Sequence, residues 1–189
     1  AYESTGHCVL LAGPGSGKTK TLTVKLARML SEDVNEPRGI ACITYNNECA
    51  RELETRLDAL GISPNGRVFI GTVHSFSLTQ ILFPYAKLAG VGLPDEFTVA
   101  TRQQSRAALE RAHAKVIKGP ENPQTWDFRM GVYRRRFLVR EQSNFDIADP
   151  QLAKLVTAYE AELRAKSLIN FDDMPLLAVR ALGTNPWLR

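Results

Sequence analysis

The chain has 189 residues, of which 44% are hydrophobic and 23% are charged, and its formal net charge is +4. A chain of this length can bury a substantial core in one or two domains. Its longest apolar runs are too short to cross a bilayer and no secretory signal precedes the first one, so we expect no membrane partner. Its three cysteines have neither metal-ligand spacing nor an even number for disulfides, which is typical of a cytoplasmic protein.

The most informative segment is a glycine-rich loop. It consists of Ala12, Gly13, Pro14, Gly15, Ser16, Gly17, Lys18 and Thr19. The apolar run Cys8–Leu11 before it predicts a strand, and the stretch from Thr19 to about Leu30 predicts a helix. In that order, the glycines let successive backbone N–H groups face a phosphate chain, and the helix adds its positive N-terminal end. We therefore expect residues 12–19 to bind the phosphates of ATP.

Two side chains of the loop carry the expected chemistry. Lys18 would reach the β- and γ-phosphates, and Thr19 would give its hydroxyl to Mg²⁺. They are the predicted catalytic residues, and Thr19 is the predicted metal ligand. Pro14 stiffens the loop, but the essential N–H donors lie later in it.

Up to about residue 89, short apolar runs alternate with helical patterns. Ile40–Ile43 and Arg67–Ile70 predict a second and a third strand, and Asn46 or Asn47 can cap the helix between them. A helical pattern after the third strand contains Pro84, which should kink or end it. This alternation predicts an α/β fold with a parallel sheet.

The middle of the chain reads as helical. Thr101 and Gln104 form a capping box for a helix that extends to about Lys118, and Asp149 caps another helix with Pro150 at its first position. The expected core stripe of this second helix consists of Leu152, Leu155, Tyr159 and Leu163.

Basic residues are concentrated in this middle part. Between residues 102 and 140 there are ten Lys and Arg and only three acids, whereas the flanking parts are nearly neutral. Such a distribution favours a polyanionic partner, although a solvated helical face would give the same pattern. The triplet Arg134, Arg135 and Arg136 is the candidate contact.

Three further segments, taken with the loop, identify a family. They are Ile43–Leu53 after the second strand, Gly71–Phe76 after the third, and Ile169–Met174 close to the end of the chain. In their order and spacing, these motifs resemble the N-terminal motifs of UvrD/Rep-type superfamily 1 DNA helicases over the whole chain.

The resemblance implies a motor with two RecA-like lobes, of which this chain is the first. The expected fold is α/β, a P-loop RecA-like parallel sheet with an inserted all-helical subdomain. Residues 1–90 would form the first part of the ATP-binding lobe, 91–166 the basic helical insertion, and 167–189 the return to the lobe. The implied activity is ATP-dependent 3′–5′ unwinding of DNA or translocation along it, with ATP and Mg²⁺ as cofactors. The implied partners are single-stranded DNA or single/double-strand junctions.

The resemblance also implies two DNA-contacting loops. The first contains Thr44, Tyr45, Asn46 and Asn47, and the second contains Thr72, His74, Ser75 and Phe76. An exposed aromatic ring can stack on a base, while small polar side chains bind phosphates. Tyr45 and Phe76 could instead be core residues, and His74 could be an ordinary loop histidine. Glu48 stands where the family commonly has Lys, so one attractive contact would be absent or repulsive here.

By the same resemblance, the family's acidic Mg²⁺-binding box is expected beyond Arg189, and the partner lobe of the same chain is missing. We therefore expect the parent protein to be a helicase and these 189 residues alone to show no ATPase. One alternative is a complete small P-loop nucleotide kinase, with Asp172 or Asp173 as its metal-binding acid and residues 134–136 in a lid. Another is a non-enzymatic DNA-binding module that retains a P-loop.

Overall fold

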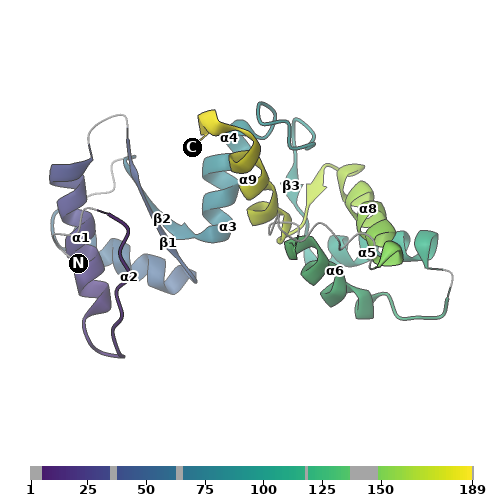
Figure 1. The fold of residues 1–189 in the computed structure, drawn as a ribbon, viewed down its shortest axis with the longest axis horizontal. Coiled ribbons are helices and arrows are strands. Elements are labelled where there is room, and N and C mark those ends of the chain that lie inside the picture. The colour runs from purple at the N-terminus through teal and green to yellow at the C-terminus, as the bar shows by residue number, and fades with distance from the viewer. Residues whose placement is uncertain (1–5, 35–37, 63–65, 118, 137–148, 189) are drawn as a thin grey trace. The chain divides into compact units, whose positions relative to one another are not determined.

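The computed structural model describes residues 6–34, 38–62, 66–117, 119–136 and 149–188. The chain forms two compact units, residues 1–76 and residues 77–189. Both combine helices with a short parallel sheet (Figure 1), so the mixed α/β class predicted from the sequence is confirmed. No helix in the described ranges has both the length and the apolar character that a bilayer span needs.

The first unit contains a two-stranded parallel sheet flanked by helices. Its elements are α1 (Lys18–Arg28), the π-helical turn η1 (Met29–Asp33), β1 (Ile40–Thr44), α2 (Asn47–Asp58), β2 (Val68–Thr72) and α3 (Val73–Phe76). The two strands run parallel, with Cys42 opposite Ile70. This arrangement confirms the second and third predicted strands and the helix between them.

Helix α2 is built as its sequence predicts. The Asn46 side chain accepts a hydrogen bond from the Cys49 backbone N–H at 2.8 Å, which caps the first turn. Leu53 and Leu57 are buried in the core of this unit. The helix ends at Asp58, and Leu60 in the turn that follows is exposed.

The predicted first strand is not formed. Residues 7–13 have no regular secondary structure, and Val9 and Leu11 are 85% and 89% exposed. A strand needs the backbone of a neighbour to pair with, and within the described residues β1 and β2 pair only with each other. The helix after the loop does form, so the prediction is correct on one side of the loop and wrong on the other.

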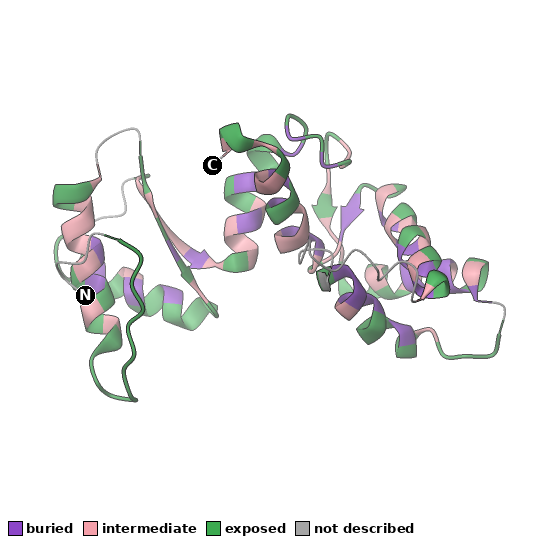
Figure 2. Cartoon of the chain, viewed as in Figure 1, coloured by how far each residue is buried: buried purple, intermediate pink, exposed green. Residues whose placement is uncertain are grey.

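The second unit is mainly helical. Its elements are η2 (Ser77–Leu82, π-helical), α4 (Phe83–Tyr85), β3 (Thr98–Val99), α5 (Arg102–Val116), α6 (Gln124–Arg136), α8 (Pro150–Arg164), β4 (Leu168–Ile169), α9 (Asp173–Thr184) and the 3₁₀ turn η3 (Pro186–Leu188). A hydrophobic core joins α5, α6 and α8, whose buried residues are purple in Figure 2.

The predicted helix starts of this unit are confirmed. At α5, Gln104 N–H donates to the Thr101 hydroxyl and Thr101 N–H donates to the Gln104 side chain, which completes the capping box. At α8, the Asp149 side chain accepts from Leu152 N–H at 3.0 Å. The four residues of the predicted core stripe of α8 are all buried: Leu152, Leu155, Tyr159 and Leu163.

One detail of this unit differs from the sequence-based expectation, and the expected break at Pro84 is confirmed. The region expected to be entirely helical contains β3, which pairs in parallel with β4 about seventy residues later. Each of these strands has only two residues, which is too short to show the alternation of apolar and polar residues that predicts a strand. The helical pattern around Pro84 becomes a π-helical turn followed by a single short turn, because proline lacks the N–H that a regular helix would use.

Candidate functional site

The glycine-rich loop of the first unit leads into α1, and the N-terminus of this helix is suited to bind an anion. Gly15 and Gly17 have φ angles of 73° and 83°, which residues with a Cβ rarely adopt. Gly17 is the N-cap of α1, no side chain caps this helix, and its first turn contains no acid. The free amide groups and the helix dipole therefore both favour a negative group at this point.

Lys18 is folded back onto its own loop. Its Nζ donates hydrogen bonds to the carbonyl oxygens of Gly13 at 2.6 Å and Ala12 at 3.1 Å. The Ser16 hydroxyl donates to the same Gly13 carbonyl at 2.7 Å. The two Lys18 contacts are exposed and join an ammonium group to neutral carbonyl oxygens, so a phosphate that offers charged oxygens would compete well for the ammonium group.

A cavity of about 230 Å³ lies at this loop. It is lined by Gly15, Ser16, Gly17, Lys18, Thr19, Lys20 and Arg56. The lining thus contains three cations and no carboxylate. Thr19 is half-buried, and its hydroxyl has no hydrogen-bond partner within the described residues. The roles of residues 12–19 in binding ATP and of Thr19 in binding Mg²⁺ stay predictions.

Arg56 is the lining residue that the sequence did not single out. It comes from α2, which packs against α1. Its Nε and Nη2 donate to Oε1 of Glu52 one turn earlier, at 3.1 and 2.7 Å. Because the residue belongs to no motif, only the packing of the two helices brings it to the loop.

A larger cavity, of about 800 Å³, lies in the second unit and is a weaker candidate. Four of its five charged lining residues, Arg134, Glu160, Arg164 and Asp173, are paired with one another, and Arg180 is the fifth. Charges that are already paired offer little to a ligand, so the smaller cavity is the stronger candidate site.

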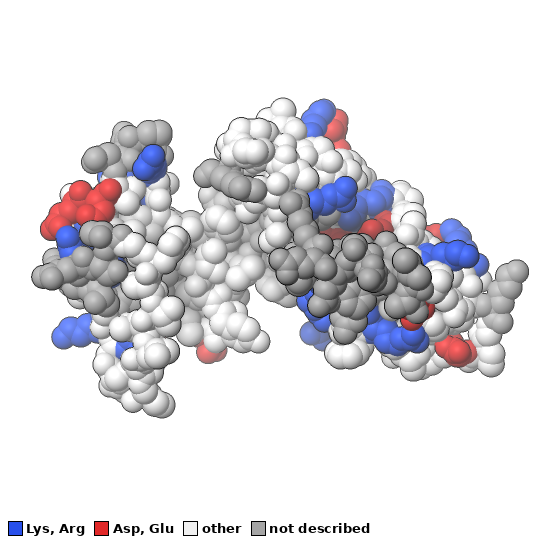
Figure 3. All heavy atoms as spheres, viewed as in Figure 1, with Lys and Arg blue, Asp and Glu red and all other residues white. Residues whose placement is uncertain are grey.

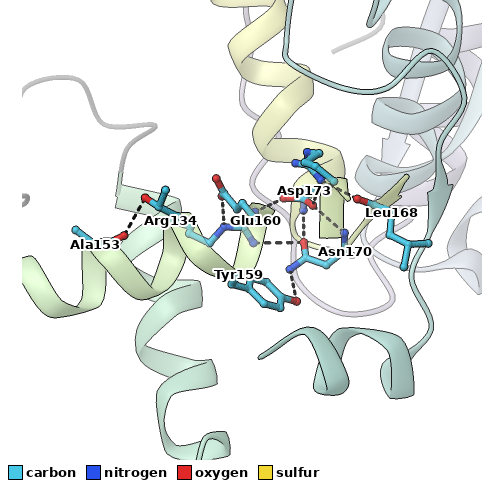
Figure 4. A network of polar contacts seen from close by, with 9 residues as sticks. Arg134, Ala153, Tyr159, Glu160, Leu168, Asn170 and Asp173 are labelled. Atoms are coloured by element: carbon cyan, nitrogen blue, oxygen red, sulfur yellow. Dashed lines mark hydrogen bonds and ion pairs between the residues drawn. The ribbon is translucent and has the colours of Figure 1, made fainter. Parts of the chain in front are cut away.

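These paired charges form a network around Asp173 (Figure 4). Arg134 donates through Nε to Glu160 at 2.9 Å, through Nη1 to Asn170 and through Nη2 to Asp173. Arg164 and the Asn170 backbone N–H donate to the other oxygen of Asp173, at 3.3 and 2.8 Å. The carboxylate thereby joins α6, α8 and α9 with Asn170, the residue that follows β4.

Burial affects the titration of two members of the network. Desolvation by itself would lower the pKa of Arg134, but the adjacent Asp173 and Glu160 carboxylates raise this pKa above its ordinary value. Burial raises the pKa of Tyr159, whose hydroxyl accepts a hydrogen bond from the Asn170 amide. Arg134 therefore stays charged and Tyr159 stays neutral inside the unit.

The first predicted DNA loop follows β1 and presents one free aromatic ring. Tyr45 is 99% exposed, so the alternative that it is a core residue is excluded. The Thr44 hydroxyl donates to the carbonyl oxygens of Asn46 at 2.8 Å and Gly71 at 3.2 Å, and the Asn46 side chain caps α2. Asn47 is exposed at the start of α2. The side chains of Thr44 and Asn46, two of the four predicted residues, thus form hydrogen bonds that stabilise the loop.

The second predicted DNA loop follows β2 and is held by its own hydroxyl groups. Thr72 N–H donates to the Ser75 hydroxyl at 2.9 Å, and Ser75 N–H donates to the Thr72 hydroxyl at 3.2 Å. A Cβ at Gly71, in β2, would lie 2.7 Å from both the Ser75 hydroxyl and the Phe69 ring, so a larger residue there would displace these side chains. Phe76 packs edge-to-face on Phe69 with ring centroids 5.2 Å apart, and His74 is half-buried.

The arginines at the end of α6 differ in how far they are buried. Arg134 is 6% exposed and points into the network, so it has a structural role in place of the predicted DNA contact. Arg135 is half-exposed and pairs with Asp172 at 3.5 Å, while the side chain of Arg136 lies outside the described residues. In Figure 3, basic and acidic side chains lie next to each other on the visible face of this unit.

Comparison with known proteins agrees with the motifs. A family model described as the UvrD/REP helicase N-terminal domain matches residues 1–189. The chain is similar to the ATP-dependent DNA helicase Rep of Escherichia coli (strain K12), with 28% identity over 98% of this chain and 28% of Rep. It is also similar to DNA helicase II of Rickettsia typhi, with 36% identity over 98% of this chain and 29% of that protein. ATP-dependent DNA helicase PcrA of Leuconostoc citreum is 28% identical over 98% of this chain and 25% of PcrA.

The chain thus spans less than a third of the length of these curated relatives, and the match covers it from end to end. The resemblance read from the motifs is therefore confirmed. The chain belongs to the UvrD/REP helicase N-terminal domain family.

Proposed function

We propose that this chain is the ATP-binding N-terminal part of an ATP-dependent DNA helicase or translocase that acts in the cytoplasm. The observation that carries the proposal is the cavity at the start of α1, where uncapped amides meet three cations and no carboxylate. This combination suits the phosphate chain of a nucleoside triphosphate.

Each lining residue has a role in the proposal. Lys18 would exchange its two carbonyl contacts for the β- and γ-phosphates, and the free Thr19 hydroxyl would bind Mg²⁺. Arg56 would add a second cation to the phosphates from α2. When Mg²⁺ is bound, it neutralises the phosphate charge that develops during γ-phosphate transfer.

Single-stranded DNA is the proposed partner of the loops after β1 and β2. Tyr45 is free to stack on a base, and both loops lie at the carboxyl ends of parallel strands, where such sheets bind ligands. Of the basic triplet, Arg135 is the described residue that supports a phosphate contact. Movement in the 3′–5′ direction and recognition of single/double-strand junctions belong to the same proposal.

The RecA-like sheet also belongs to the proposal. A completed sheet would take residues 8–11 as a strand, which would cover the exposed Val9 and Leu11. The division into residues 1–90, 91–166 and 167–189 stays a prediction, as does a second motor lobe that completes the ATP site.

The alternative of a small nucleotide kinase is disfavoured by the surroundings of its two candidate acids. Asp173 is 1% exposed and accepts hydrogen bonds from two arginines and a backbone N–H, so its carboxylate is shielded from solvent and occupied by these donors. Asp172 pairs with Arg135 at the start of α9.

Calorimetric titration with Mg–ATP tests the nucleotide proposal. Lys18→Ala should lower the affinity about 10- to 100-fold, because a charge-assisted hydrogen bond contributes about 1.5–3 kcal/mol. Lys154→Ala is the matched control, since it removes an exposed lysine from α8. Equal affinity of the parent chain and Lys18→Ala would contradict the proposal.

A further inference from the structure

We propose that Glu52 is a positioning residue of the nucleotide site, which holds the Arg56 guanidinium in place at the phosphate-binding loop. The inference rests on the proposed ATP binding and extends that site to a carboxylate outside the loop. Both residues lie on α2, so it concerns the first unit alone.

The geometry fixes the direction of the guanidinium. Nε and Nη2 of Arg56 both donate to Oε1 of Glu52, at 3.1 and 2.7 Å. Two bonds to one oxygen restrict the rotation of the guanidinium plane more than a single bond does. Arg56 lines the cavity and Glu52 does not, so the carboxylate holds the cation from outside the space that the phosphates would fill.

The remaining donors of Arg56 leave room for a nucleotide. A guanidinium has five N–H groups, of which Glu52 takes two. Both N–H groups of Nη1 and one of Nη2 remain, and they can bind phosphate oxygens while the ion pair persists. The pair therefore need not break when a nucleotide binds.

The contribution of this pair to folding is expected to be small. The two side chains are 45% and 50% exposed, and exposed pairs one turn apart on a helix stabilise proteins little. An unpaired arginine at this position would sample many rotamers, and binding would then have to restrict them. The effect of Glu52 should thus be visible in nucleotide affinity and not in thermal stability.

The test is a double-mutant cycle on Mg–ATP affinity, measured by calorimetry. Arg56→Ala should lower affinity about 3- to 10-fold, and Glu52→Ala about 2- to 3-fold. Glu52→Gln should retain the affinity of the parent chain, because its amide oxygen can accept the same two N–H groups. In the Arg56→Ala background, Glu52→Ala should have no further effect.

Two controls separate this role from a general effect of charge. Glu54→Ala removes the same charge from the same helix, two residues away and thus on another face, and should leave affinity unchanged. The thermal unfolding midpoint should be the same for all these variants and the parent chain.

Unchanged or increased affinity in Glu52→Ala would overturn the inference, as would an equal loss in the Arg56→Ala background. If Lys18→Ala still weakens binding in that case, the ATP proposal stands and only the role of Glu52 fails. If the parent chain does not bind Mg–ATP, both fail together.

Discussion

Arg134 and Asp173 lie 39 residues apart in the chain, and their side chains form an ion pair that is almost completely buried. Arg134 comes from α6 and Asp173 begins α9, so the pair fastens these two helices to each other. Arg164 shares the carboxylate, and Asn170 contacts both partners. A cation that the sequence assigns to DNA is thereby used to assemble the second unit.

The first prediction concerns this pair. Asp173→Ala should lower the free energy of unfolding by about 3–5 kcal/mol, because Arg134 then loses a buried carboxylate partner. Urea denaturation followed by circular dichroism measures the change. Asp172→Ala, at the neighbouring half-exposed carboxylate, should change stability by less than about 1 kcal/mol.

If Asp173→Ala kept full stability but lost Mg²⁺ binding, Asp173 would be a metal ligand. That result would favour the nucleotide-kinase alternative over a structural role for the network.

The second prediction concerns pH. Hydrogen bonds from Lys115 and Arg111 on α5 lower the pKa of Glu162 on α8 from 4.5 to about 2. Since the pKa is lower in the folded chain, the stabilisation is complete above pH 4.5 and is lost as the pH falls towards 2. Glu162→Gln should therefore be less stable than the parent chain near neutral pH, and the difference should shrink over this interval.

Thermal unfolding at a series of pH values measures this difference. A stability gap between Glu162→Gln and the parent chain that stays constant across the interval would contradict the role of the ion pairs.

The third prediction concerns the exposed ring at the end of β1. Tyr45→Ala should weaken single-stranded DNA binding by about 1–3 kcal/mol, the usual contribution of one base stacked on an aromatic ring. Tyr45→Phe should retain binding because it keeps the ring. Fluorescence anisotropy with a labelled oligonucleotide measures both variants, and Phe83→Ala in the second unit is the aromatic control. Identical affinities for the parent chain and Tyr45→Ala would exclude stacking at this ring.

The fourth prediction concerns Glu48, which is exposed in the first turn of α2 close to Tyr45. An acid at a helix start stabilises the helix, but here it would repel a phosphate chain. Glu48→Lys should increase single-stranded DNA affinity and steepen its salt dependence, by a slope of up to about −0.7 for each additional phosphate neutralised. Glu48→Gln should give a smaller increase in affinity. If the salt slopes of all three proteins coincide, DNA does not pass near this residue.

Several features could be predicted from the sequence because they depend on neighbours within one helical turn. The capping box at Thr101, the Asn46 and Asp149 caps and the glycine turn before α1 each need only residues three positions apart or fewer. The apolar stripe of α8 follows from helical periodicity in the same way. The family also could be read from the sequence, since its motifs are short and their order is preserved.

Tertiary structure alone decided the features that join distant residues. Arg134 and Arg135 are adjacent and chemically identical, yet one is buried among carboxylates and the other faces solvent. Arg56 reaches the phosphate-binding loop only because α2 packs on α1, and β3 exists only because β4 lies beside it. Residues 8–11 have a strand-like pattern but form no strand, because hydrogen bonds between strands require a second backbone. Local sequence determines which elements a segment can form, whereas burial, ion pairing and strand pairing depend on which segments the fold brings together.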